Sequence, residues 1–269
     1  MVSIVILTIG KAEKVLECLK KQTFQDFEVI LAQEKGIVNA MNNALAKAKG
    51  EIFVRIDDDV KMLEWWLESL ILPFNDPMVA GVTGPTFVYK EHRKYRDSIR
   101  WAENPNKFLN WLYDNGEFKP AGIRKCGVVS YDSNYYERFG YIKNNAYNDK
   151  WKYYYPDHLE GTNWAMRTEL IRKVGGFDHK FDGVAEWFDD DVVFKVKKLG
   201  YRLAYNPNAA LNHLLEKGKH YSDRFEGFGR IKNFIRFHWR HGRLRFLNIK
   251  FYVYLIVWGG YFVWKRFKK

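Results

Sequence analysis

Two groups of closely spaced carboxylates are the residues of this 269-residue chain best suited to chemistry. The first is the run of three aspartates at 57–59, and the second lies within 186–191. Carboxylate oxygens are preferred ligands of Mg2+ and Mn2+, and a carboxylate can also remove a proton from a hydroxyl group. The two groups therefore predict a metal site and a general base.

The first group follows a short apolar segment, 51–56, which we expect to be a β-strand. Side chains two residues apart on a strand point the same way, so Asp57 and Asp59 can face one pocket. A divalent cation held there keeps open positions for the phosphate oxygens of a ligand. The alternative is a solvated acidic turn, which the preceding strand disfavours.

The second group comes directly before an expected helical segment, 192–199. Carboxylates in a first helical turn stabilise the helix N-terminus, so capping explains one of them. Three consecutive aspartates beside Glu186 and two aromatic residues exceed what capping needs. We therefore expect one of these carboxylates to act as a general base.

Apolar segments alternate between strand-like and helix-like patterns and supply the scaffold. This alternation predicts an α/β fold with a mostly parallel sheet and flanking helices, and ligands bind such sheets at the carboxyl ends of the strands. The run 57–59 lies at such an end. The expected strands are 3–8, 27–32, 51–56, 78–82, 201–205 and 209–213, and the expected helices are 12–22, 36–49, 62–72, 168–174 and 189–199.

Composition and motifs narrow the function classes. A hydrophobic fraction of 47% supports a packed core. The two cysteines have no zinc or disulfide spacing, and we find neither G-x-G-x-x-G after the first strand nor a Walker A motif. The first residues lack a basic segment and a cleavage site, so we expect no signal peptide and a cytoplasmic protein.

Most of the net charge of +12 lies in the last part of the chain. Residues 214–269 contain 14 Lys and Arg against three Asp and Glu, a net charge of +11. Such asymmetry indicates an anionic partner surface, either a membrane or nucleic acid.

Two segments of this basic region have sequence patterns that are typical of membrane-associated helices. Apolar residues recur every three or four positions within 224–241, which predicts a basic amphipathic helix. Residues 251–264 form an uncharged run of 14, below the roughly 18–20 residues that span a bilayer. We favour peripheral attachment to the cytoplasmic face of an anionic membrane. A short tilted span, packing on the catalytic domain, a helical hairpin and a dimer contact are the alternatives.

Ordered blocks across residues 2–213 resemble glycosyltransferase family 2, whose members have a GT-A fold. The blocks follow the family's order at similar spacing, which is more specific than one D-x-D motif. They read VSIVILT, LKKQTFQDFEVI, NNALAKAKGEI, RIDDD, RTELIRKVGGFD, FDDDVVFKVKKLGY and NPNAALNH.

The resemblance implies a Rossmann-like GT-A domain over 1–213, which moves a sugar from a nucleotide-diphosphate sugar to an acceptor hydroxyl with inversion. Its nucleotide-binding half covers about 1–89, and its acceptor half, with a variable insertion, covers 90–213. The basic, aromatic-rich helical extension follows at 214–269. The implied cofactor is Mn2+ or Mg2+, the donor a UDP-, GDP- or TDP-sugar, and the acceptor a glycan or lipid-linked glycan.

The resemblance assigns roles to individual residues by their positions in the family's motifs. Asp57 and Asp59 match the metal-binding motif, and His213 matches a histidine that helps to hold the metal or diphosphate in some relatives. Asp189 matches the general base, and Asp191 matches the second acidic position of that motif. The implied nucleotide contacts are Thr8, Glu34, Asn42, Asp57 and Asp58.

Three positions depart from the family pattern. The usual aspartate pair after the second strand reads Gln33-Glu34, and the usual Arg-Asn in the next helix reads Met41-Asn42. The glutamate position of the base motif is Phe188, for which Glu186 can compensate. These departures leave the preferred nucleotide open.

An aromatic stretch at 131–155, with ten aromatics in 25 residues, suits an acceptor platform because aromatic faces stack on sugars. A satellite cluster packing a long insertion is the alternative. The acceptor candidates are Trp151, Tyr154, Trp164, Glu186 and Trp187.

Two other functions stay open on the residues alone. One is a metal-dependent phosphodiesterase or nuclease, and the other is a nucleic-acid-binding module that uses the basic region. The near-neutral first 213 residues and both acidic clusters argue against nucleic acid as a partner. A homo-oligomer is compatible with the sequence.

Overall fold

The structure is a computed structural model of the chain. It describes residues 1–10, 12–88, 158–159, 161–181, 186–214 and 228–241, with positions 249, 252–253, 255–257 and 259–260. The aromatic stretch 131–155, with Trp151 and Tyr154, lies outside the described residues.

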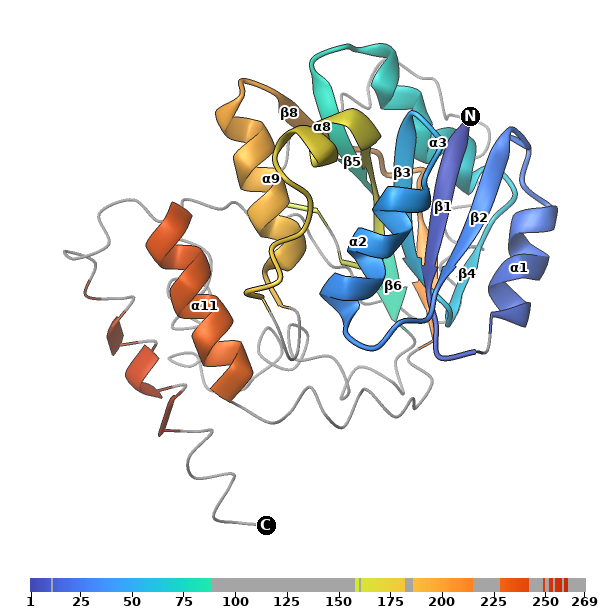
Figure 1. Cartoon of the computed structure of the whole chain (residues 1–269). Helices are drawn as coiled ribbons and strands as arrows, with labels where there is room; N and C mark the ends of the chain where they lie inside the picture. Colours follow the sequence, from blue (N-terminus) through green and yellow to red (C-terminus); the bar gives the residue numbers. More distant parts are fainter. Residues whose placement is uncertain are drawn as a thin grey trace.

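A six-stranded sheet forms the centre of the molecule (Figure 1). β1 pairs in parallel with β2 and β3, and β5 pairs in parallel with β8. β7 lies antiparallel to both of its neighbours, so the sheet is mixed but mostly parallel. The strand order is β2 (Phe27–Ala32), β1 (Val2–Leu7), β3 (Ile52–Asp57), β7 (Asn163–Arg167), β5 (Val79–Thr83) and β8 (Arg202–Tyr205).

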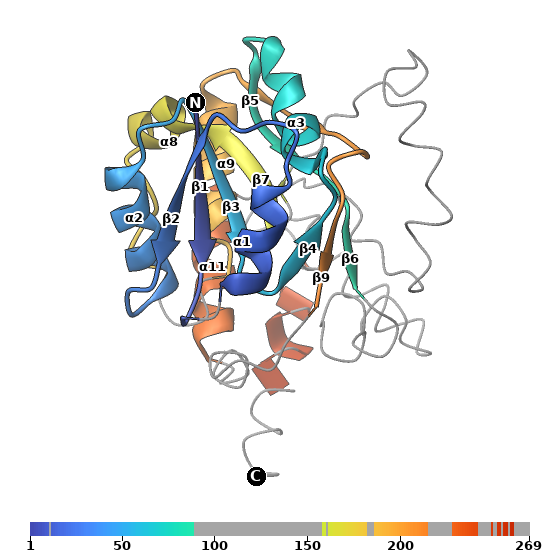
Figure 2. The same ribbon diagram turned by 90° about the vertical axis from the view of Figure 1, so that its right-hand side faces the viewer.

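Helices cover both faces of this sheet, as Figure 2 shows. Successive side chains of a strand point to opposite faces, so Ile4 and Val5 belong to two different apolar clusters. The cluster with Val5 packs against α2 (Ile37–Lys47), α8 (Thr168–Lys173) and α9 (Phe188–Lys198). The cluster with Ile4 packs against α1 (Glu13–Lys20) and α3 (Trp66–Ile71), which the short η1 (Leu72–Asn75) follows.

A second, three-stranded sheet extends from the end of β3. Its order is β4 (Val60–Met62), β9 (Leu211–His213) and β6 (Thr86–Val88). The expectation that a helix begins at Met62 is wrong, because 60–62 pair with the distant β9 and α3 begins only at Trp66. The chain passes very close to itself beside this sheet: a Cβ at Gly84 would lie 2.0 Å from the carbonyl oxygen of Ala209. Only glycine fits there.

The C-terminal helix α11 (Phe228–His241) packs against α9. It lies within the predicted helix 224–241. Its inner side buries Phe234 and Phe237, whereas Ile235 and Trp239 are exposed. Within the described part of the chain, no helix combines the length and the apolar character that crossing a membrane requires.

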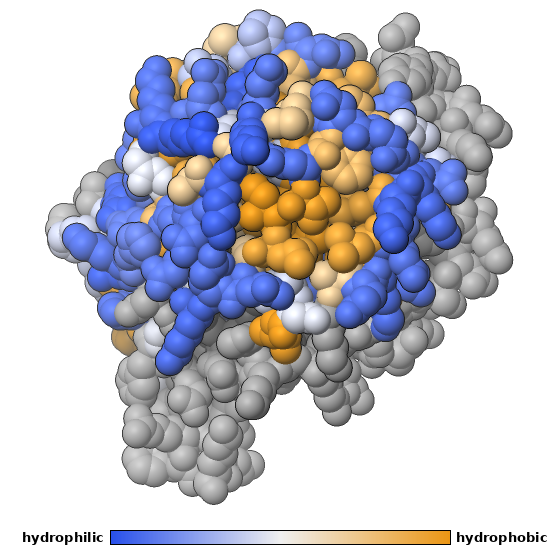
Figure 3. All heavy atoms as spheres, turned by 45° about the vertical axis from the view of Figure 1, so that its right-hand side comes forward, coloured by the Kyte–Doolittle hydropathy of each residue, from blue (hydrophilic) through white to orange (hydrophobic). Residues whose placement is uncertain are grey.

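One edge of the main sheet is apolar and accessible. Figure 3 shows hydrophobic side chains gathered between α1 and α2, where β2 forms the edge of the sheet. Side chains 27–30 of β2 are half-buried, and Leu31 is exposed. Unpaired strand edges are the sites where further strands can add. The homo-oligomer that the sequence allows stays a prediction.

Candidate active site

Two carboxylates and an imidazole meet at the carboxyl end of β3. Asp57 ends the strand, and Asp59 lies in the turn that leads into β4. His213 ends β9, which pairs with β4 so that His213 lies opposite Val60. The Nε2 atom of His213 lies 3.1 Å from an oxygen of Asp59 and 3.8 Å from one of Asp57. The three residues predicted as metal ligands are therefore brought together from positions far apart in the sequence.

These three side chains have the chemistry of a divalent cation site. One ligand atom from each lies within 4.8 Å of the others. Carboxylates suit Mg2+ and Mn2+, and an imidazole nitrogen is compatible with Mn2+. The side chains are 10–15% exposed. Three protein ligands at a partly open site leave coordination positions for phosphate oxygens.

Asp58 contacts Thr8, whereas Asp57 and Asp59 face His213. Burial raises the pKa of Asp58, against a hydrogen bond from the Thr8 hydroxyl. Thr8 follows β1, and its hydroxyl also accepts a hydrogen bond of 2.9 Å from the backbone N–H of Gly10. Gly10 has φ of 111°, which glycine tolerates best. Thr8 and Asp58 thus lie together at the same edge of the sheet as the metal ligands.

Arg55 connects the two acidic groups and was not predicted. One guanidinium nitrogen lies 3.1 Å from an oxygen of Asp57, and another lies 3.5 Å from an oxygen of Asp189. The Arg55 side chain is only 6% exposed. A charged residue inside an otherwise apolar strand is the sequence signal that could have identified it.

Asp189, the predicted base, lies in the first turn of α9. Burial raises the pKa of its carboxyl group, although the neighbouring Arg55 acts in the opposite direction. One of its oxygens accepts the backbone N–H of Asp190 at 3.0 Å. A partly buried carboxylate with a raised pKa is suited to take up a proton.

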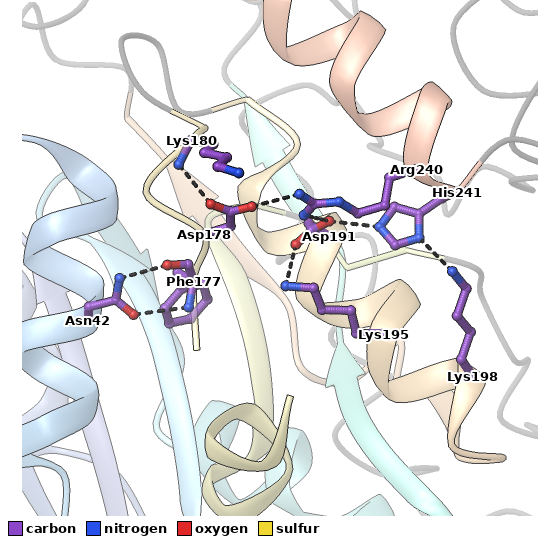
Figure 4. A network of polar contacts seen from close by, with 9 residues as sticks. All are labelled: Asn42, Phe177, Asp178, Lys180, Asp191, Lys195, Lys198, Arg240 and His241. Atoms are coloured by element: carbon purple, nitrogen blue, oxygen red, sulfur yellow. Dashed lines mark hydrogen bonds and ion pairs between the residues drawn. The ribbon is translucent and has the colours of Figure 1, made fainter. Parts of the chain in front are cut away.

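Asp191 faces away from this site, toward α11 (Figure 4). Its fully buried carboxylate lies 2.7 Å from each of Lys195, Arg240 and His241. Burial raises its pKa, but the hydrogen bonds from these three residues outweigh it and lower the pKa to about 2. Arg240 also contacts Asp178 at 2.8 Å. Residues two apart on a helix point in nearly opposite directions, so Asp189 and Asp191 serve different surroundings.

Two of the implied nucleotide contacts have other partners. The Asn42 side chain binds the backbone of Phe177, donating to its carbonyl at 2.7 Å and accepting from its N–H at 3.0 Å (Figure 4). These two hydrogen bonds fix the loop after α8. They also occupy the side-chain amide of Asn42, which the resemblance assigns to donor binding. Glu34 follows β2 and lies 3.4 Å from Lys47.

Two aromatic acceptor candidates belong to the core instead. Trp164 is fully buried and stacks on Phe53, with ring centroids 6.0 Å apart. Trp187 is 7% exposed and stacks on Phe237 at 4.6 Å. Both rings pack within the core, which does not favour stacking on a sugar, and their acceptor role stays a prediction. Large aromatic residues pack into interiors as readily as they line sites, and composition cannot separate the two. Glu186, the residue before Trp187, is half-buried.

Comparisons with known sequences point to one family. The model of the family "Glycosyl transferase family 2" matches residues 10–175. A "Probable glycosyltransferase YdaM" of Bacillus subtilis (strain 168) is 36% identical over 64 residues, which are 24% of this chain and 14% of the Bacillus protein.

Two solved structures share the fold. The mannosyltransferase PcManGT from Pyrobaculum calidifontis, in complex with GDP-Man and Mn2+, matches with a TM-score of 0.54 at 17% identity, over 97% of this chain and 69% of that one. GalNAc-T7 with UDP, GalNAc and Mn2+ matches with a TM-score of 0.57 at 12% identity, over 88% of this chain and 47% of that one.

Proposed function

Because the chain belongs to glycosyl transferase family 2, we propose that it transfers a sugar from a nucleotide-diphosphate sugar to an acceptor hydroxyl group with the help of a divalent cation. The observation that carries this proposal is the cluster of Asp57, Asp59 and His213, whose ligand atoms lie within 4.8 Å of one another. The bound molecules of the two structural relatives, a nucleotide or nucleotide-sugar with Mn2+, support the same interpretation.

The donor would occupy the edge of the sheet where β1 and β3 end. Asp57, Asp59 and His213 would hold the cation, which, when bound, neutralises charge on the diphosphate leaving group. Thr8 and Asp58 lie beside this cluster and line the approach of the nucleotide. Glu34, at the end of the neighbouring β2, can accept from an N–H of a base. The nucleotide would be uridine, guanosine or thymidine diphosphate.

Asp189 would act as the general base in one displacement. The acceptor hydroxyl oxygen forms a bond to the anomeric carbon of the sugar, and the bond from that carbon to the diphosphate breaks. The hydroxyl proton passes to the Asp189 carboxylate. A single displacement of this kind inverts the anomeric carbon, as the family resemblance implies.

We also infer that the C-terminal region brings the enzyme to an anionic membrane, where a lipid-linked or surface glycan is the acceptor. The outer side of α11 supports this inference, because Ile235 and Trp239 are 38% and 55% exposed. Lys232, on the same helix, is also exposed. Apolar and cationic side chains on one helix suit the interface between lipid headgroups and acyl chains.

A donor screen tests the proposed function. The protein would be incubated with Mn2+ or Mg2+ and a panel of UDP-, GDP- and TDP-sugars, and release of the nucleoside diphosphate would be measured with and without chelator. We expect slow, metal-dependent release from one class of donor. Release from none of them, together with metal-dependent cleavage of a phosphodiester such as an oligonucleotide, would favour the phosphodiesterase alternative.

A further inference from the structure

Arg55 is a buried cation placed between the predicted metal site and the predicted base. It lies on β3 between Val54 and Ile56, which are fully buried. A buried guanidinium is costly unless its charge is paired and its N–H groups are bonded. Its partners are Asp57 and Asp189, at 3.1 and 3.5 Å. The two contacts use different nitrogens, so the planar group joins two carboxylates from distant parts of the chain.

The local structure keeps this bridge in place. Arg55 and Asp57 are two residues apart on a strand and point to the same face, which α9 covers. The Phe188 ring lies 5.8 Å from the guanidinium carbon. At Gly161, a Cβ would lie 3.2 Å from Arg55 and 3.7 Å from Asp189. The absence of a side chain at Gly161 leaves room for the pair.

The two carboxylate oxygens of Asp57 face two different residues. Its Oδ1 atom contacts Arg55, and its Oδ2 atom faces His213 at 3.8 Å. Arg55 therefore contacts only one oxygen of the Asp57 carboxylate and leaves Oδ2 facing the metal cluster. On its other side, the same guanidinium fixes Asp189. The Arg55 guanidinium thus joins a residue of the candidate metal cluster to the proposed base.

We propose that Arg55 is a positioning residue that holds the general base Asp189 in register with the donor site. This inference rests on the proposed function. Displacement needs the base, the acceptor oxygen and the anomeric carbon in one geometry, and small misplacements lower the rate of the chemical step more than they weaken binding. Loss of Arg55 should therefore lower kcat while the KM for the donor stays close to that of the wild type.

Three variants test this role. Arg55→Met removes the charge at similar length, and Arg55→Lys keeps the charge on one nitrogen, which cannot reach both carboxylates. Arg167→Met is the matched control, because Arg167 also bonds inside the fold, to the carbonyls of Val79 and Phe74, at the opposite end of the sheet. All three would be assayed for kcat and donor KM, with thermal unfolding measured in parallel.

For Arg55→Met we expect kcat to fall roughly 10- to 100-fold, as for other residues that orient ligands of a site. Arg55→Lys should be intermediate, and Arg167→Met should keep its kcat even if its melting temperature falls. A kcat of Arg55→Met near that of the wild type, or no lower than that of Arg167→Met, overturns the proposal. If Arg55→Met does not fold, Arg55→Lys decides: a lower kcat at an unchanged donor KM supports the bridge, and wild-type kcat overturns it.

Calorimetry adds a readout without turnover. Each variant would be titrated with Mn2+ and the nucleoside diphosphate that the wild type binds. Arg55→Met should retain binding, in contrast to Asp59→Ala. If Arg55→Met loses binding of Mn2+ and the nucleoside diphosphate as fully as Asp59→Ala, Arg55 serves the donor site alone. The proposed role of Arg55 in positioning Asp189 is then wrong. A wild type without any transfer activity would instead contradict the proposed function.

Discussion

Four ionisable side chains set the chemistry at the residue scale. Asp57, Asp59 and His213 form a cluster that could hold a metal ion, and Asp189, the proposed base, lies on the other side of Arg55. All four side chains are partly buried, and Arg55 lies between Asp57 and Asp189. The two roles can therefore be separated by single substitutions.

Asp189→Asn should remove transfer and leave donor binding nearly intact. The amide keeps the size of the side chain but cannot accept the proton, and general-base contributions are typically about 10²- to 10⁴-fold. Kinetics and calorimetry on the same preparation would measure both effects. If the variant retains nearly full transfer, the assignment of Asp189 as base is wrong.

The pH profile of kcat gives an independent check on this base. Burial raises the pKa of Asp189, against the influence of Arg55. Only the deprotonated carboxylate accepts a proton, so kcat should fall as the pH drops through this pKa, which lies above the ordinary value of roughly 3.9. A kcat that is flat down to pH 4, in a protein still folded there, would contradict the prediction.

Asp59→Ala should weaken metal-dependent nucleotide binding. The change removes one of three ligand atoms and leaves His213 without its closest carboxylate, at 3.1 Å in the wild type. Titration with Mn2+ at a fixed nucleotide concentration would measure the loss. Glu68→Ala is a control carboxylate on α3, whose partner is Thr23. Equal metal affinity in Asp59→Ala and the wild type would exclude this residue as a ligand.

At the scale of elements, α11 packs against α9, the helix that carries the proposed base Asp189. Trp187, directly before α9, has φ of 69°, a left-handed conformation that is costly for a non-glycine residue. Its ring stacks on Phe237 of α11, and Asp191 of α9 contacts Arg240 and His241 of α11. The start of α9 is thus fixed from the C-terminal side, and the C-terminal region contributes to the catalytic domain.

Asp191→Asn should lower stability more than catalysis. The folded-state pKa of about 2 lies below the ordinary 3.8, so the charge of Asp191 contributes ~2 kcal/mol at neutral pH. This contribution is complete above the unfolded-state pKa and is lost as the pH falls toward 2. Urea unfolding of the wild type and the variant at pH 7 and close to pH 2 would measure it, with kcat determined at pH 7 on the folded protein. If Asp191→Asn instead has a kcat well below that of the wild type and an unchanged free energy of unfolding, the catalytic role that the family motif implies is supported.

At the scale of the whole molecule, the sequence predicts the local features well. Apolar runs located β1, β2 and β3, and the acidic runs located the aspartates of the candidate metal cluster and Asp189. Features that depend on distant partners were missed: β7 has the mixed sequence NWAMR, and β4 becomes a strand only by pairing with β9. The partners of Arg55 and the burial of Trp164 likewise depend on packing across the fold.

Membrane binding is the property of the whole molecule that the exposed side of α11 predicts. Wild-type protein should float with anionic liposomes at low salt and less at high salt, because salt screens the attraction. Lys232→Glu with Trp239→Ala should weaken flotation. Lys20→Glu, on α1 at the opposite side of the molecule in Figure 1, is the control. Full-length protein that stays unbound at low salt would refute this part of the account.

Thermal unfolding with Mn2+ and nucleotides tests the central claim, a metal-dependent nucleotide site at Asp57, Asp59 and His213, most directly. The melting temperature would be measured with UDP, GDP or TDP, each with Mn2+ and with chelator, and with a single-stranded oligonucleotide. Binding to the folded state raises the melting temperature. We predict stabilisation by one nucleoside diphosphate only when Mn2+ is present, and stabilisation by the oligonucleotide alone would contradict the account.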